Sequence, residues 1–228
     1  MVLRGYEYMN ILLMGKPGCG KGTLANALIQ EGWLHLSTGN LMREKMRNDD
    51  PMAQELKLLL NQGKFATDEM TIEIVQQYLA KIGSSENVLF DGFPRTIPQS
   101  HWLKENYKID LVVYLEISDQ TLTERITNRR VHPQSGRIYN TLFNPPKIEG
   151  IDDETGEPLI TRKDDTAEVI AQRLKEFETL TAPAYRVLKE AGIPVLEINA
   201  QQHSQAIKQE VLNYIAQLKV NPKMLKYI

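Results

Sequence analysis

The sequence predicts an α/β protein built on an open parallel β-sheet with helices on both faces. Three features of the 228-residue chain support this fold class. Short, continuous apolar runs have the length of strands that are buried on both faces. Helical stretches separate these runs, so strand and helix alternate, and parallel strands joined in this way need right-handed crossovers. A glycine-rich loop at residues 15–23 joins the first apolar run to a helix.

The expected elements follow this alternation in order. The strands are the apolar runs at residues 10–14, 33–37, 87–90, 111–117 and 193–199. The helices lie at residues 22–30, 41–49, 51–63, 68–83 and 166–192. Gly63 and Gly83 close two of these helices, as glycine often does at a helix C-terminus. Pro183 is expected to interrupt the last helix, because proline has no N–H to donate within a helix.

One stretch, residues 131–160, breaks the alternation. It is rich in proline and glycine and has no helical period. A stretch of this length is too long for a plain connection. A solvated excursion is one interpretation, but the charges that flank the stretch favour an inserted β subdomain that acts as a lid.

Composition limits the class of protein and its partners. Apolar residues make up 42% of the chain and charged residues 25%, as in ordinary globular proteins, and the formal net charge is −2. This charge argues against general nucleic-acid binding, which needs a basic face. Cys19 is the only cysteine, so an internal disulfide is impossible and a reducing compartment is expected. No apolar run approaches the ~20 residues of a membrane span, and the N-terminal residues do not resemble a signal peptide. We therefore expect a cytoplasmic protein with no membrane partner.

Residues 15–23, GKPGCGKGT, have the form of a phosphate-binding loop with one irregularity. The general pattern is Gly, four residues, Gly-Lys and then Ser or Thr. Gly15 and Gly20-Lys21 fit that spacing, but Gly22 has no hydroxyl and Thr23 comes one place late. Glycines let backbone N–H groups approach an anion, and the following helix places its positive end there. A glycine-rich turn without a ligand is the alternative, and the position between strand and helix argues against it. The loop therefore predicts nucleotide binding.

Five downstream motifs narrow the class of nucleotide-binding protein. They are STGNLMRE at 37–44, DGFPRTIPQ at 91–99, RITNRRVH at 125–132, NPPK at 144–147 and TRKDD at 161–165. Together with the glycine-rich loop, these motifs closely resemble those of the adenylate kinases, in the long-lid form common in bacteria. The resemblance covers nearly the whole chain, from Asn10 to about Leu218. The loop of this family has the sequence GKGT, so the resemblance implies that the displaced Thr23 is typical of the family.

The resemblance implies a P-loop nucleoside-phosphate kinase fold, with a five-stranded parallel sheet flanked by helices and two inserts. The core is expected at residues 1–36, 67–127 and 166–228, an AMP-binding insert at 37–66 and a lid insert at 128–165. The implied reaction is reversible transfer of the terminal phosphoryl group of ATP to AMP, which gives two ADP. Ligands are expected at the carboxyl ends of the strands, where open α/β sheets bind them.

The resemblance also implies roles for individual residues. The expected ATP-binding residues are Gly18, Cys19, Gly20, Lys21, Gly22, Thr23, Arg125, Arg129, Ile138, Tyr139 and Gln202. The expected AMP-binding residues are Thr38, Arg43, Lys64, Phe65, Ala66, Gly92, Phe93, Pro94, Arg95, Gln99, Arg162 and Arg173. The expected catalytic residues are Lys21, Arg95, Arg129, Arg162, Arg173, Asp164 and Asp165. Mg²⁺ is expected to be held mainly by nucleotide oxygens and waters, with Asp91 behind one of those waters.

The arginines fit the chemistry of phosphoryl transfer, because several negative charges meet at one place and a guanidinium group grips phosphate with two N–H groups. Any one of them could instead be a solvated surface charge. Arg173 lies three residues after Ile170 and four before Phe177, at an apolar helix face. A side chain that snorkels from the edge of this face is the alternative to one aimed at phosphate. Asp164 and Asp165 could cap this helix or pair with lid arginines, and both interpretations stay open.

Thr38 and Gln99 are implied to read the adenine of AMP. Related pyrimidine monophosphate kinases tend to carry Ala in place of Thr38 and Asn in place of Thr96. The amide of Gln99 can both donate and accept hydrogen bonds, as adenine requires. Asn40 departs from the usual Asp of the family.

The lid of some relatives holds zinc with four cysteines. This chain has His132, Ser135, Asp152 and Thr155 at the matching places. Serine and threonine are poor zinc ligands and no thiolate is available there, so we expect a hydrogen-bonded cluster and no structural zinc. Cys19 could be a reactive thiol at a helix N-terminus, but a small residue at a variable loop position is the simpler interpretation.

The predicted function is therefore that of an adenylate kinase, a monomer that uses ATP, AMP and Mg²⁺. One alternative is another kinase of the class, which would phosphorylate UMP or CMP. A second alternative is a nucleotide-binding switch protein without transfer activity. Such a protein is expected to lack DGFPRT and Arg43, and this chain has both.

Overall fold

The computed structural model describes residues 8–61, 66–83, 86–161 and 165–220, in which five parallel strands form one sheet. The strands are ordered β2-β3-β1-β4-β7, with bounds β1 (Asn10–Gly15), β2 (Leu34–Ser37), β3 (Val88–Asp91), β4 (Leu111–Glu116) and β7 (Val195–Asn199). The helices are α1 (Lys21–Ile29), α2 (Thr38–Lys45), α3 (Pro51–Asn61), α4 (Asp68–Ile82), α5 (Ile97–Asn106), α6 (Asp119–Thr127), α7 (Ala167–Glu176), α8 (Ala182–Glu190) and α9 (Ser204–Val220). This arrangement confirms the predicted fold class.

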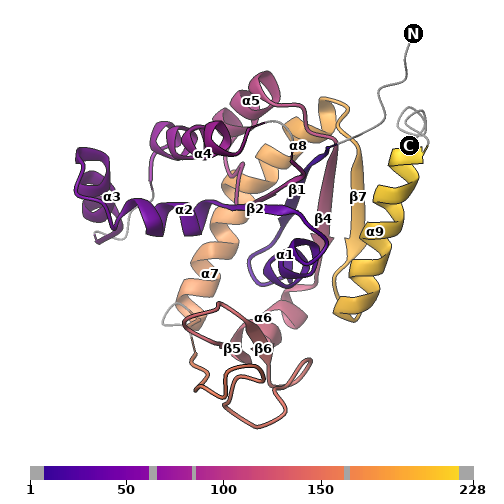
Figure 1. Ribbon diagram of the computed structural model, residues 1–228. Coiled ribbons are helices and arrows are strands. Elements are labelled where there is room, and N and C mark those ends of the chain that lie inside the picture. The colour runs from indigo at the N-terminus through magenta and orange to yellow at the C-terminus, as the bar shows by residue number, and fades with distance from the viewer. Residues whose placement is uncertain (1–7, 62–65, 84–85, 162–164, 221–228) are drawn as a thin grey trace.

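Both faces of the sheet are buried, which explains why its strands are continuous apolar runs. Along β1, Ile11 and Leu13 pack into a core with α1 and α9. Leu12 and Met14 point to the opposite face and pack into a second core with α4, α5 and α8. The sheet therefore runs between two layers of helices (Figure 1).

Two segments project from the sheet. Helices α2 and α3 extend to the left in Figure 1, where Leu56 packs with Met70 and Ile74 of α4 in a separate small cluster. After α6, the antiparallel strands β5 (Arg129–Val131) and β6 (Ile138–Asn140) form a second sheet at the lower end of the view. These segments lie within the residue ranges predicted for the two inserts, whose boundaries stay a prediction.

The helical stretch after residue 166 differs from the prediction at Pro183. Helix α7 continues through a π-helical turn, Phe177–Thr181, directly into α8, and Pro183 lies in the first turn of α8. The N–H of Ala182 reaches the carbonyl of Phe177, five residues back. The helix does not end at Pro183, but its α-helical hydrogen-bond pattern is interrupted just before this residue, because the wider turn shifts the hydrogen-bond register ahead of the residue that lacks an N–H.

Helices α5, α6 and α9 were not among the expected elements. Helix α5 buries Gln99 and Ser100 beside Leu103, so it has no clear apolar period. Helix α6 has nine residues and buries only Leu122 and Ile126. None of the described helices is long and apolar enough to cross a membrane.

Phe90 tests the packing of the second core. The side chain is 0% exposed in the middle of the sheet. Phe90→Ala should lower the free energy of unfolding by about 3–5 kcal/mol, because it removes buried surface and leaves a cavity. Urea denaturation measures this loss. Leu142→Ala is the control, since Leu142 is 61% exposed, and it should change stability by less than about 0.5 kcal/mol. Equal effects of the two changes would contradict the placement of Phe90.

Candidate active site

The loop after β1 has the backbone of a phosphate-binding loop. Gly15, Gly18 and Gly20 have φ values of 136°, 87° and 108°, in the left-handed region that favours glycine. A Cβ atom at Gly15 would lie 2.5 Å from the carbonyl oxygen of Leu115, and one at Gly18 would lie 2.5 Å from Ile126. The glycines therefore serve close packing of the loop against β4 and α6 as well as the turn itself.

Gly22, the residue that breaks the general loop pattern, lies in the first turn of α1. A Cβ atom there would be 3.3 Å from Cδ1 of Ile138, on strand β6. A larger side chain would press against this strand, so the contact favours a residue without a side chain. Ile138, predicted to bind ATP, is thus placed beside the loop.

Lys21 lies inside the curve of the loop. Its Nζ donates to the carbonyl oxygens of Gly15 at 2.7 Å and of Lys16 at 2.9 Å. The carbonyl of Lys16 also accepts from the N–H of Cys19 at 3.2 Å, which closes the loop turn. Cys19 itself is fully buried in the core, in line with its interpretation as a small packing residue.

Asp91 ends β3 next to the loop and carries the carboxylate predicted to act through water on Mg²⁺. Its Oδ2 is 3.2 Å from Nε2 of His35, on the neighbouring strand β2. Burial raises the pKa of Asp91, but the His35 hydrogen bond and the charges of Lys21 and Arg95 outweigh it, so the pKa is lowered overall. The carboxylate is therefore ionised at neutral pH and faces two cations.

Arg95 and Thr38 converge on Gly92, which follows Asp91. Nε of Arg95 donates to the Gly92 carbonyl at 2.8 Å, and the Thr38 hydroxyl donates to the same oxygen at 2.9 Å. Gly92 has a φ of 80°, and a Cβ atom there would lie 2.8 Å from the Thr38 hydroxyl. Desolvation by the surrounding protein is the main cause of a lowered pKa of Arg95; Asp91 opposes this shift and Arg173 adds to it. The structure thus brings Arg173 of α7 near Arg95.

Gln99 is held in a polar network beside Arg95. Its Oε1 accepts from the N–H of Arg95 at 2.8 Å, and its Nε2 donates to Oδ1 of Asp68 at 2.7 Å. The Thr96 hydroxyl donates to the same Asp68 oxygen at 2.8 Å. Gln99 is only 4% exposed, so Asp68 and Arg95 fix the orientation of its amide.

Two lid-side arginines have defined partners. Arg129 and Asp165 form a two-pronged ion pair in which Nε donates to Oδ2 at 2.8 Å and Nη2 donates to Oδ1. Asp165 does not cap α7, because the side chain of Thr166 accepts from the α7 backbone instead. Arg125 donates to the carbonyl of Cys19 at 3.3 Å, and its guanidinium carbon lies 5.5 Å from the centre of the Phe143 ring.

The four residues at the zinc positions of relatives form hydrogen bonds with one another. Nδ1 of His132 is 2.7 Å from the Ser135 hydroxyl, and Nε2 is 3.4 Å from the Thr155 hydroxyl. The Thr155 hydroxyl donates to Oδ2 of Asp152 at 2.9 Å. We call these residues the lid cluster. Within the described part of the chain, no group of three or more His, Cys, Asp or Glu residues is arranged to hold a metal ion.

Asp152 is the electrostatic centre of the lid cluster. Arg137 donates to both of its oxygens, at 2.8 and 2.6 Å, and the Tyr139 hydroxyl donates at 3.0 Å. These bonds lower the pKa of Asp152 far below its usual range, with the Arg137 contact as the largest cause, and they raise the pKa of Arg137. Tyr139, predicted to bind ATP, therefore directs its hydroxyl into the lid cluster.

The remaining predicted site residues are less closely connected. Arg43 donates to the side chain of Asn40 on α2. Ala66 packs against the small cluster that Leu56 forms with Met70 and Ile74. Gln202 is exposed after β7. Phe93 and Pro94 are buried beside Gly92. Thr23 is exposed on α1. Four predicted residues lie outside the described residues, namely Lys64, Phe65, Arg162 and Asp164.

Several polar contacts of the site were not predicted. His35 stands two residues before the STG motif and Asp68 opens α4, but nothing in their spacing marks them as partners of Asp91 and Gln99. Glu157 lies 2.6 Å from Nε2 of His132. Glu157 and Arg137 thus both contact the lid cluster from positions that carry no motif. Only the three-dimensional pairing of these segments identifies them.

Fold and site define a P-loop α/β protein of the nucleotide-binding class, with the loop at the carboxyl edge of a parallel sheet. Comparison with known proteins is more specific. The sequence profile of the family described as adenylate kinase matches residues 13–193. Adenylate kinases of Francisella tularensis subsp. novicida (strain U112) and Francisella philomiragia subsp. philomiragia are each 40% identical to this chain. The matches cover 91% of this chain, and 99% and 100% of those proteins. The chain belongs to the adenylate kinase family, which confirms the resemblance.

Asp152→Asn tests the electrostatics of the lid cluster. Because the folded-state pKa of Asp152 is depressed, its carboxylate stabilises the fold fully above the unfolded pKa of about 3.9, and this contribution is lost as the pH falls below that value. At pH 7, Asp152→Asn should lower the melting temperature, measured by circular dichroism. The difference from wild type should begin to shrink below about pH 4 and continue to shrink as the pH falls further toward the depressed folded-state pKa.

The matched control is Glu154→Gln, which removes a more exposed carboxylate from the same arginine, Arg137. It should have a much smaller effect at pH 7, because exposed ion pairs contribute little. A pH-independent effect of Asp152→Asn would contradict the electrostatic account.

Proposed function

We propose that this protein catalyses the reversible transfer of the terminal phosphoryl group of ATP to AMP, which gives two ADP. The observation that carries the proposal is the meeting of two half sites at one edge of the sheet. The phosphate loop with Lys21 follows β1, and the DGFPRT segment with Asp91 and Arg95 follows β3, its direct neighbour. Placement of donor and acceptor side by side accounts for much of the catalysis in such transfers.

The donor side of this proposal uses the loop and the root of the lid. Loop N–H groups and the α1 N-terminus bind the phosphates of ATP, and the Lys21 ammonium group, held by the carbonyls of Gly15 and Lys16, contacts these phosphates. Arg129 adds a guanidinium group that binds the same phosphates, and Asp165 already orients this group through a bidentate ion pair. Arg125 lies against the donor base, beside Cys19.

The acceptor side uses the residues around Gly92. Arg43 and Arg95 bind the phosphate of AMP, and Thr38 and Gln99 read its base. Gln99 uses one N–H and one oxygen lone pair on Asp68 and Arg95, and its amide keeps a second N–H and a second lone pair. Arg173 and Arg162 contact the transferred group and the acceptor, and Arg173 is supported by its proximity to Arg95.

Magnesium fits the residues that are present. Asp91 supplies an ionised carboxylate, the hard oxygen ligand that Mg²⁺ prefers, and Mg²⁺ usually keeps several waters and binds through substrate phosphates. One carboxylate reaching the ion through water is enough for this mode of binding. When bound with ATP, Mg²⁺ neutralises charge on the donor phosphates.

The two projecting segments provide closure. We infer that residues 37–66 close over AMP and residues 128–165 close over ATP, because water in the site would divert the phosphoryl group to hydrolysis. The lid cluster supports a metal-free lid that moves as one small unit. The protein is further proposed to act as a cytoplasmic monomer, which size-exclusion chromatography and cell fractionation test.

An activity panel tests the proposal directly. Purified protein with Mg·ATP should phosphorylate AMP far faster than UMP or CMP. Preference for a pyrimidine monophosphate would favour another kinase of the class, and binding of ATP without transfer to any acceptor would favour a switch protein. The contacts that organise Arg95, Thr38 and Gln99 around Gly92 support AMP as the acceptor.

Lys21→Met tests the donor loop. Removal of a cation that stabilises the transferring phosphoryl group should lower kcat by about 10²–10³-fold, the range for other contacts of this kind. A coupled assay of ADP formation measures the loss, and the melting temperature should stay close to that of wild type. Lys81→Met, an exposed lysine on α4, is the control and should be fully active. Near-normal turnover of Lys21→Met would exclude this role of the loop.

Arg95→Ala tests the acceptor side. The change should raise the KM for AMP at least tenfold while leaving the affinity for ATP within about twofold, because a charge-assisted contact to phosphate contributes about 1.5–3 kcal/mol. Calorimetry with each nucleotide separates the two affinities. Arg186→Ala, on the exposed side of α8, should change neither. Equal weakening of both nucleotides in Arg95→Ala would show that Arg95 does not belong to the acceptor side.

A further inference from the structure

Helix α6 contacts the phosphate loop at three points along its length. Leu122 and Ile126 pack under Gly18, where a Cβ atom would lie within 2.5 Å of Ile126. Arg125 donates to the carbonyl of Cys19 at 3.3 Å. At the start of the helix, Asp119 forms an ion pair with Lys16, with 2.5 Å between Nζ and Oδ1. Residues from the first residue of α6 to its last turn thus contact the phosphate loop.

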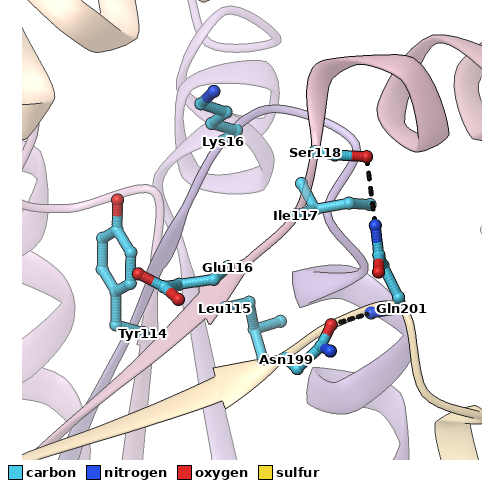
Figure 2. A pocket seen from close by; sticks show the side chains of 8 residues that line it. All are labelled: Lys16, Tyr114, Leu115, Glu116, Ile117, Ser118, Asn199 and Gln201. Atoms are coloured by element: carbon cyan, nitrogen blue, oxygen red, sulfur yellow. Dashed lines mark hydrogen bonds between the residues drawn. The ribbon is translucent and has the colours of Figure 1, made fainter.

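Lys16 connects helix α6 to Lys21 through its side chain and its carbonyl oxygen. Its side chain reaches α6, and its carbonyl oxygen accepts from both Nζ of Lys21 and the N–H of Cys19. Any displacement of Lys16 therefore moves an oxygen that directly holds the Lys21 ammonium group. Lys16 and Ser118, the residue before Asp119, both line a hollow of about 420 Å³, and Figure 2 draws their side chains.

The α6 end of the ion pair is firmly held. The Ser118 side chain accepts from the backbone N–H of Thr121 and so caps the helix. Nε2 of Gln201, after β7, donates to the Ser118 hydroxyl at 3.0 Å, as drawn in Figure 2. Asp119 lies in the first turn of α6, where a negative charge is favourable at the positive end of the helix. The start of α6, which carries Asp119, is therefore anchored on the side that faces the loop.

We propose that the ion pair between Lys16 and Asp119 is a positioning device for Lys21. It holds the Lys16 carbonyl, and through it the Lys21 ammonium group, at the place where the donor phosphates bind. Lys16 is thus a positioning residue for the donor side, and Asp119 is its partner. This inference rests on the proposed function.

A direct role of Lys16 as a phosphate ligand is the competing account, and the two make opposite predictions for Asp119. If Asp119 only neutralises a phosphate-binding lysine, its removal frees that charge and strengthens ATP binding. If Asp119 positions the loop, its removal weakens ATP binding, as removal of Lys16 does. The geometry favours positioning, because the Lys16 ammonium group is already engaged by Asp119.

The expected effect is modest, because both side chains retain solvent contact, with Lys16 24% and Asp119 64% exposed. Exposed pairs of this kind change equilibria by roughly two- to fivefold. Lys16→Met and Asp119→Asn should each lower kcat/KM for ATP by about that factor and leave the KM for AMP unchanged. The double variant should be no worse than the single variants, because both remove the same interaction. Lys16→Arg should keep the pair and restore activity.

The experiment compares these four variants with wild type in a steady-state assay and by calorimetric titration of ATP alone. Lys104→Met, an exposed lysine on α5, controls for the loss of a positive charge elsewhere. High salt should reduce the difference between wild type and Lys16→Met, because it screens the pair. Melting temperatures, expected to be nearly equal, separate positioning from a general loss of structure.

Three outcomes would overturn the inference: tighter ATP binding by Asp119→Asn, additive losses in the double variant, or no change in Lys16→Met. Failure of the proposed function is a separate result, since wild-type protein would then transfer nothing to AMP. The calorimetric comparison of ATP affinities would still decide the role of the pair.

Discussion

The rest of the structure depends on the close seating of the phosphate loop between β4 and α6. A single added carbon at Gly15 would lie 2.5 Å from a carbonyl oxygen of β4, and one at Gly18 would lie as close to Ile126 of α6. Only glycine permits both this approach and the left-handed backbone. The seating brings the loop and Lys21 to the carboxyl edge of the sheet, and β1 pairs directly with β3, which ends in Asp91. The neighbourhood of Lys21 and Asp91 is therefore a consequence of strand pairing.

Carboxylates hold the cations of this site in position. Asp165 holds the fork of Arg129, and Asp91 lies close enough to Lys21 and Arg95 for both to lower its pKa. Without such partners, the gathered cations would repel one another, as the effect of Arg173 on Arg95 indicates. The Arg129–Asp165 pair fixes the orientation of its guanidinium group. If the proposed function is correct, this reduces the reorganisation that phosphate binding needs.

The sequence predicted the parts of this protein that depend on local pattern. The five strands were recognisable because both their faces are buried, and the phosphate loop because glycine, lysine and helix follow one another in fixed order. Helix α9 has a regular apolar spacing and could have been predicted, whereas α5 could not, because it buries Gln99 and Ser100. The contacts of His35 and Asp68 depend on distant segments, so no local pattern marks them. Family resemblance predicted the site residues, but the partners that these residues contact required the structure.

The lid cluster is organised around one buried carboxylate. Such a carboxylate is costly unless donors surround it, and Asp152 has two N–H groups of Arg137, two hydroxyls and two backbone N–H groups. The stability of this centre depends on the ionisation of Asp152. Strand β6 connects this centre to the phosphate loop, because successive side chains of a strand point in opposite directions. Tyr139 points into the lid cluster, while Cδ1 of Ile138 lies 3.3 Å from the position that a Cβ atom at Gly22 would take. Two adjacent residues of one short strand therefore face the lid cluster and the phosphate loop.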